Sequence, residues 1–195
     1  MADLRDLGDR DPRVALAAAC RLLWARGLVA AWAGNGSVRT DHGFLATPTG
    51  MCLGLVEPEV LVALDPEGRA AGPGRPTSEW PLHRALYRAR SGVVAVLHTH
   101  SPFATCLALR ERGIGPLTPE IAHHLGEVPC VAFAPPGTEA LGEAVAAAAR
   151  RDRGGALLAR HGAVAWGRSV AEAFFLAELV EEAAALAVRA GVGVP

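Results

Sequence analysis

Residues 93–102 of the chain read VVAVLHTHSP, and this stretch decides the fold class. Residues 93–97 are a continuous apolar run, which is typical of a buried strand. His98-Thr99-His100 extends that strand, and Ser101-Pro102 then begins a helix, because serine caps helix N-termini and proline fits the first turn. A buried strand followed at once by a helix indicates an α/β fold.

Strands and helices alternate on both sides of this stretch. Helices are expected at residues 11–26, 77–90, 101–112, 120–125, 138–151 and 169–190. Strands are expected at residues 37–40, 44–47, 61–64, 93–100, 128–133, 156–159 and 163–166. Several of these strands are joined by short turns, as in hairpins. The sequence therefore predicts one domain over residues 1–195, with a three-layer α/β/α architecture around a mainly antiparallel or mixed central sheet.

The composition excludes several classes of protein. The 195 residues carry a formal net charge of -1, so we expect no broad basic face and no nucleic-acid partner. No apolar run reaches the roughly 18 residues that span a bilayer. The charged residues 1–13 lack the apolar core of a signal peptide. We therefore expect a cytoplasmic protein with no membrane partner.

The chain contains no lysine, so all 19 of its basic residues are arginine. This absence excludes an internal lysine Schiff base and a P-loop, because both need a lysine side chain. The four cysteines form no CxxC pair and are expected to be free thiols: Cys20, Cys52, Cys106 and Cys130.

His98 and His100 form the first candidate for a metal site. Alternate side chains of a strand share a face, so both imidazoles point the same way and could bind one ion. The alternative is a pair of solvated histidines at the end of a strand. The buried run before them and the helix start after them favour the metal site.

A catalytic metal site needs a third ligand, and His161 is the first candidate for it. His161 interrupts two apolar strand segments and is followed by Gly162, which permits a close approach of the backbone. The alternative is a histidine satisfied within the core. The remaining histidines stay open as ligands: His42, His83, His123 and His124. Three imidazoles would suit zinc, manganese, cobalt or iron.

Three segments of small residues are candidates for binding an anion. Thr77 and Ser78 precede an expected helix, whose free N–H groups and dipole favour negative charge. The loop 34–37, which holds Asn35, and the turn Thr49-Gly50 could wrap a phosphate with backbone donors. An ordinary helix cap and two ordinary turns are the alternatives.

Glu79 follows these hydroxyl groups in the first turn of the expected helix. One interpretation is that its carboxylate only complements the helix dipole. The other is that it acts as a general base beside the metal.

The combination of these segments resembles the class II aldolase/adducin family. The matching segments run in the family's order and cover nearly the whole chain: AGNGSVR (33–39), TPTG (47–50), PTSEWPLH (76–83), VLHTHSPFAT (96–105), PPGT (135–138) and LLARHGAVAWG (157–167). The resemblance implies a three-layer α/β/α domain that forms a homotetramer, with active sites between neighbouring subunits.

By this resemblance, His98, His100 and His161 are the metal ligands, and Glu79 is the catalytic acid/base. The residues that fall on phosphate-binding positions are Asn35, Thr49, Gly50, Thr77 and Ser78. The implied activity is that of a metal-dependent lyase, an aldolase that cleaves a keto-sugar 1-phosphate into dihydroxyacetone phosphate and an aldehyde. A divalent ion, zinc before manganese, cobalt or iron, would stabilise the enediolate that cleavage leaves.

One segment departs from the family's pattern. Fuculose-phosphate aldolases use a tyrosine after the HxH segment to protonate the departing aldehyde, whereas residues 115–126 contain no tyrosine. Glu120 roughly matches a catalytic glutamate of related dehydratases, although a plain acid in a first helical turn is the alternative. The other activities left open are a dehydratase or a decarboxylase on the same scaffold, and a non-catalytic adducin-like module.

Overall fold

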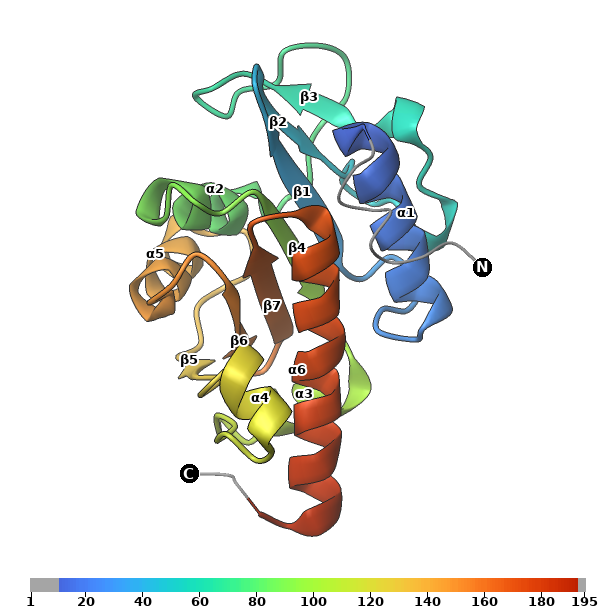
Figure 1. Ribbon diagram of the computed structural model, residues 1–195. Coiled ribbons are helices and arrows are strands. Elements are labelled where there is room, and N and C mark those ends of the chain that lie inside the picture. Colours follow the sequence, from blue (N-terminus) through green and yellow to red (C-terminus); the bar gives the residue numbers. More distant parts are fainter. Residues whose placement is uncertain (1–10, 193–195) are drawn as a thin grey trace.

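Residues 11–192 are described by a computed structural model, which is built around one seven-stranded sheet (Figure 1). The strands are β1 (Asn35–Thr40), β2 (Gly43–Ala46), β3 (Val62–Leu64), β4 (Ala95–Thr99), β5 (Cys130–Val131), β6 (Gly154–Leu158) and β7 (Gly162–Gly167). Their order in the sheet is β3-β2-β1-β4-β7-β6-β5, and all neighbours are antiparallel except the parallel pair β5 and β6. The predicted mixed, mainly antiparallel sheet is confirmed.

Helices cover both faces of this sheet (Figure 1). They are α1 (Pro12–Ala25), α2 (Trp80–Ala89), α3 (Pro102–Leu109), α4 (Pro119–His124), α5 (Glu139–Ala148) and α6 (Val170–Ala190), and two short 3-10 turns, η2 (Leu53–Leu55) and η3 (Pro58–Val60), are added to them. Helices α2 and α5 pack together on one face, while α1, α3 and α6 cover the other. The three-layer α/β/α architecture is therefore confirmed. Within residues 11–192, no helix has both the length and the apolarity needed to cross a membrane.

Strand β4 lies at the centre of the sheet and is buried along its whole length. Its side chains alternate between two cores. Leu97 packs in the core that lies beneath α1, α3 and α6, and Val96 packs in the core beneath α2 and α5. Burial on both faces of the sheet thus explains the continuous apolar run at residues 93–97.

Strand β5 is much shorter than the strand expected at residues 128–133. Pro129 has no N–H group to donate to a neighbouring strand. Val128 pairs instead with Ile114, in an isolated bridge away from the sheet. Only Cys130 and Val131 remain to pair with β6, so this prediction of the strand's length was wrong.

Helix α2 begins at Trp80, three residues later than the earliest start expected from the sequence. Glu79 is its N-cap residue, and Pro81 occupies the first turn, where a missing N–H group costs nothing. The backbone N–H of Glu79 donates to the hydroxyl oxygen of Thr77 at 3.2 Å. This turn fixes Glu79 at the point where the chain enters the helix.

Candidate metal centre

Three histidines meet where β4 ends. His98 lies on β4, His100 follows its last residue, and His161 lies in the turn between β6 and β7. Because β7 pairs with β4 along its length, this turn is brought beside the end of β4. One ring nitrogen from each histidine lies within 4.8 Å of the other two, and the Nε2 atoms of His98 and His100 are 2.9 Å apart. The structure thus places the candidate third ligand beside the pair, and the other four histidines outside this group.

The hydrogen bonds of His98 test whether a metal fits this cluster. Its Nδ1 lies 2.8 Å from the carbonyl oxygen of Ala163 and donates to it. Burial, helped by the neighbouring His161 and His100, holds the pKa of His98 well below its ordinary value, so the ring is neutral. Its single ring proton is therefore on Nδ1, and the lone pair of Nε2 points into the cluster. A backbone carbonyl that orients an imidazole in this way is typical of a metal-binding histidine.

Glu79 faces the same cluster from the start of α2. Its carboxylate oxygens lie 3.1 Å from Nε2 of His98 and 3.3 Å from Nε2 of His161. The carboxylate and the bare Nε2 of His98 are both acceptors, so a cation between them would remove their repulsion. Burial and the nearby His161 also lower the pKa of His100, to about 4, which keeps its ring neutral and free to bind a metal. The donor set of three imidazoles beside a carboxylate fits a divalent transition-metal ion.

A cleft of about 170 Å³ opens above these side chains. It is lined by the three histidines, by Glu79 and by all five residues expected to bind phosphate: Asn35, Thr49, Gly50, Thr77 and Ser78. Thr49, Gly50 and Ser78 are exposed at its mouth, whereas Asn35 and Thr77 are buried at 7% and 5%. The structure therefore brings together three loops that are far apart in the sequence.

Gly34 allows one of these loops to lie against β4. A Cβ atom at this position would lie 2.9 Å from the carbonyl oxygen of His98, and the backbone φ of +79° also favours glycine. Asn35 follows directly and pairs with His98 across β1 and β4. Residues opposite one another in neighbouring strands share a face, so Asn35 points toward the cleft side of His98.

Glu120 is not brought to this cleft within one chain. It is exposed in the first turn of α4, and it is not among the residues that line the cleft. Its position fits a plain first-turn acid that complements the helix dipole.

His83 has a role near the cleft that the sequence did not single out. It was only an alternative metal ligand on a helix face, but the structure buries it completely between Asn35 and Ser37. Burial lowers the pKa of His83 to about 3, so its ring is neutral. The signal that could have found it is its spacing of four residues from both Glu79 and Tyr87, which places all three on one side of the helix.

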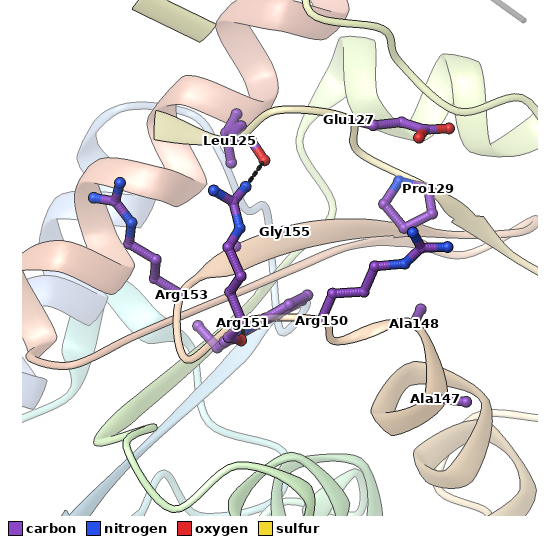
Figure 2. A pocket seen from close by; sticks show the side chains of 11 residues that line it. Leu125, Glu127, Pro129, Ala147, Ala148, Arg150, Arg151, Arg153 and Gly155 are labelled. Carbon is purple, nitrogen blue, oxygen red and sulfur yellow. Dashed lines mark hydrogen bonds between the residues drawn. The ribbon is translucent and has the colours of Figure 1, made fainter. Parts of the chain in front are cut away.

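A larger cavity of about 330 Å³ lies at the opposite end of the β6–β7 hairpin (Figure 2). Arg150, Arg151 and Arg153 surround it. The guanidinium of Arg151 donates to the carbonyl oxygen of Leu125 at 2.6 Å, and Arg153 lies 3.5 Å from the carboxylate of Glu172. No histidine or cysteine lines this cavity among the described residues, so the histidine cleft is the candidate centre.

The sequence and the fold are similar to those of known proteins. Residues 14–188 match the family described as "Class II Aldolase and Adducin N-terminal domain". The chain is 37% identical to 3-oxo-tetronate 4-phosphate decarboxylase of Cupriavidus necator, over 86% of this chain and 80% of that protein. It is 40% identical to 5-methylthioribulose-1-phosphate/5-deoxyribulose-1-phosphate aldolase of Rhodospirillum rubrum, over 85% and 75% of the two chains. The crystal structure of L-fuculose-1-phosphate aldolase from Thermus thermophilus superposes with a TM-score of 0.83 at 34% identity, over 93% of this chain and 95% of that chain.

Proposed function

The chain belongs to the class II aldolase and adducin family, and from that premise we propose that it is a divalent-metal-dependent lyase acting on a phosphorylated keto sugar. The observation that carries the proposal is the position of Glu79. Its buried carboxylate lies 3.1 Å and 3.3 Å from ring nitrogens of two of the three histidines. A carboxylate that could transfer a proton is thus held directly beside three candidate metal ligands, an arrangement that suits metal-assisted cleavage of a carbon–carbon bond next to a carbonyl.

His98, His100 and His161 would hold the metal. Zinc is the first choice, with manganese, cobalt and iron as alternatives. When bound, the ion would supply a Lewis acid that polarises the carbonyl group of the substrate. The protein's part is to present three imidazoles. Burial keeps those of His98 and His100 neutral, and the carbonyl of Ala163 also fixes the tautomer of His98.

The phosphate of the substrate would lie at the mouth of the cleft. The hydroxyl groups of Thr49 and Ser78 are available there, and that of Thr77 is buried just inside, next to the N-terminus of the ten-residue helix α2. The partial positive charge of a helix N-terminus favours an anion. A substrate bound by its phosphate at this end would extend inward toward Glu79 and the histidines.

Glu79 would move the proton of the reacting carbon. In the cleavage direction its carboxylic acid gives a proton to the carbon that keeps the bonding electrons. In the reverse direction its carboxylate removes that proton. With a keto-sugar 1-phosphate as substrate, the products are dihydroxyacetone phosphate and an aldehyde, and this aldolase reaction is our first candidate.

A decarboxylase reaction is the second candidate, and one observation favours it. Among the described residues, Glu79 is the only carboxylic acid that lines the cleft, and no tyrosine, lysine or arginine lines it. Aldol cleavage needs a second proton-transfer group, at the oxygen that becomes the aldehyde, whereas loss of carbon dioxide needs none. The similarity to a 3-oxo-tetronate 4-phosphate decarboxylase agrees with this alternative.

A product assay separates the two reactions. The purified protein, loaded with Zn²⁺, Mn²⁺ or Co²⁺, is incubated with several keto-sugar 1-phosphates and with 3-oxo-tetronate 4-phosphate. An aldehyde formed together with dihydroxyacetone phosphate supports the aldolase, and carbon dioxide supports the decarboxylase. No product from any of these substrates, at a rate above that of His98→Ala, would contradict the proposed function.

A further inference from the structure

Two regular spacings meet where α2 packs against β1. Glu79, His83 and Tyr87 are four residues apart at the start of α2 and along it, so they share one side of the helix. Asn35 and Ser37 are two residues apart on β1, so they share one face of the sheet. Four helical residues rise about 6 Å, and two strand residues rise about 7 Å. Because these two spacings are similar, the side chains of β1 lie between those of α2.

The interleaved side chains form one continuous series of hydrogen bonds. The amide nitrogen of Asn35 donates to Oε2 of Glu79 at 3.3 Å, and its Oδ1 lies 2.6 Å from Nε2 of His83. Nδ1 of His83 lies 2.7 Å from the hydroxyl of Ser37, which is also 2.7 Å from the hydroxyl of Tyr87. All five side chains are buried, with exposed fractions from 0% to 7%. We call this series the α2–β1 chain.

The donor of each hydrogen bond in the α2–β1 chain can be assigned in turn, starting from Glu79. Oε2 of Glu79 accepts from the NH₂ group of Asn35, so the oxygen of Asn35 faces His83. The neutral ring of His83 then carries its proton on Nε2, which leaves Nδ1 as an acceptor. Ser37 must donate to that nitrogen, and Tyr87 must donate to Ser37. Asn35, His83 and Ser37 are each left with one possible arrangement, and the hydroxyl of Tyr87 also lies 3.5 Å from the carbonyl oxygen of Val94.

We propose that His83 is a positioning residue, which fixes the carboxamide of Asn35 and through it holds Oε2 of Glu79 beside the three-histidine cluster. Because an amide does not pass protons along, the α2–β1 chain orients the carboxylate and does not conduct protons. The inference rests on the proposed function, since the orientation of Glu79 affects turnover only if Glu79 transfers a proton.

The loss of His83 would remove one hydrogen bond of Asn35. Its Oδ1 would lose its partner inside the core, and an unpaired buried acceptor is costly. The carboxamide could then rotate, and Glu79 would lose the N–H group that holds the side of its carboxylate nearest to His98. The three metal ligands make no hydrogen bond to His83, so metal binding is expected to survive.

Three variants test this role by kinetics. In His83→Leu we expect kcat to fall about 10- to 100-fold, the range that a small misplacement of a reacting group causes, with KM and bound metal unchanged. In His83→Gln we expect most of the rate to return, because the glutamine amide can both donate to Asn35 and accept from Ser37. Arg84→Ala is the matched control on the same helix, since Arg84 pairs at the surface with Glu139.

Three kinetic results would overturn the proposal. They are an unchanged kcat in His83→Leu, a His83→Gln variant as slow as His83→Leu, and an equal loss in Arg84→Ala. A loss of bound metal in His83→Leu would also overturn it, because the effect would then act on the metal ligands.

A second measurement does not depend on lyase activity. The ¹⁵N chemical shifts of the histidine rings in the whole protein report which nitrogen of each ring carries a proton. We expect His83 to be protonated on Nε2 and unprotonated on Nδ1, and the opposite tautomer would overturn the α2–β1 chain. If His83 shows the expected tautomer but no phosphorylated substrate reacts, the proposed function fails while the α2–β1 chain stands.

Discussion

At the scale of single residues, Glu79 carries the proposed chemistry. The variant Glu79→Gln keeps the size of the side chain and an oxygen that can accept from Asn35, but it has no acid to give up or take back a proton. We expect kcat to fall about 10²- to 10⁴-fold, the usual contribution of a general acid or base. Bound metal per chain should stay the same, as measured by elemental analysis. Turnover at the rate of the unaltered protein would contradict the role of Glu79.

His98 is expected to be essential for metal binding. The variant His98→Ala removes the ligand that Ala163 orients, and the two remaining imidazoles make a weaker site. We expect its divalent metal content to fall several-fold after dialysis. His42→Ala is the control, because His42 is exposed in the turn between β1 and β2 and should leave the metal content unchanged. Equal metal contents in the two variants would contradict the assigned ligands.

The residues of the site differ in how far the sequence could predict them. His98 and His100 are two residues apart. Because side chains alternate along a strand, this spacing alone was enough to predict that both lie on one face. His161 could only be ranked among other histidines, because its place beside the pair depends on the pairing of β7 with β4. The spacing of His83 from Glu79 and Tyr87 places the three on one side of the helix. Its partners Asn35 and Ser37 could not be predicted from that spacing, because they are 48 and 46 residues away in the chain.

At the scale of the elements, Gly162 is the first residue of β7 and lies against the end of β4. A Cβ atom at this position would overlap the carbonyl oxygen of Thr99 and lie 3.1 Å from the ring of His100. We therefore expect Gly162→Ala to lower the free energy of unfolding by about 1–3 kcal/mol, as overpacking does, and to weaken metal binding.

Gly72→Ala is the matched control for this change, because nothing lies within 4 Å of a Cβ atom built at Gly72. Thermal unfolding and metal titration of the two variants provide the measurement. If Gly162→Ala unfolds at the same temperature as Gly72→Ala and binds metal equally well, the close approach of the two strands is unimportant.

The elements themselves could mostly be predicted, because their signals lie within a few residues. The apolar run of β4 and the cap and closing glycine of α6 are signals of this kind, and both elements are present in the structure. The length of β5 was mispredicted because it depends on which backbone groups find a partner. Val128 is apolar and β-branched like a strand residue, yet its hydrogen bonds go to Ile114.

At the scale of the whole molecule, we propose that four chains assemble with the clefts between neighbours. Several large apolar side chains are exposed on the single chain, with exposed fractions of 73% for Trp32, 71% for Leu55, 63% for Leu109 and 51% for Phe133. Exposed apolar surface of this kind is typical of contacts between subunits. Light scattering should give four times the chain mass of 20.2 kDa. A monomer at micromolar concentration would contradict the assembly.

The stability of the whole fold should depend on the acidity of the solution through His83. Burial lowers the pKa of His83 from 6.5 to about 3 in the folded chain. Between pH 6.5 and about pH 3, His83 is protonated in the unfolded chain but stays neutral in the folded chain. The free energy of unfolding therefore falls as the pH falls. The slope is about 1.4 kcal/mol per pH unit for one such group.

Denaturant unfolding of the metal-free protein between pH 7 and pH 4 measures this slope. The variant His83→Gln has no group that titrates at this position, so its stability should fall less steeply over the same range. Parallel curves for the two proteins would show that His83 contributes nothing to the slope.

The division of the cleft into a buried and an exposed half has a practical consequence for protein engineering. Glu79 and His98 are buried and His100 and His161 are half-buried, whereas Thr49, Gly50 and Ser78 are exposed at the rim. Libraries randomised at these three rim positions should alter which molecules bind, while the proposed proton-transfer group and metal ligands stay in place. The substrate specificity of this fold could therefore be changed by substitutions at the rim of the cleft alone.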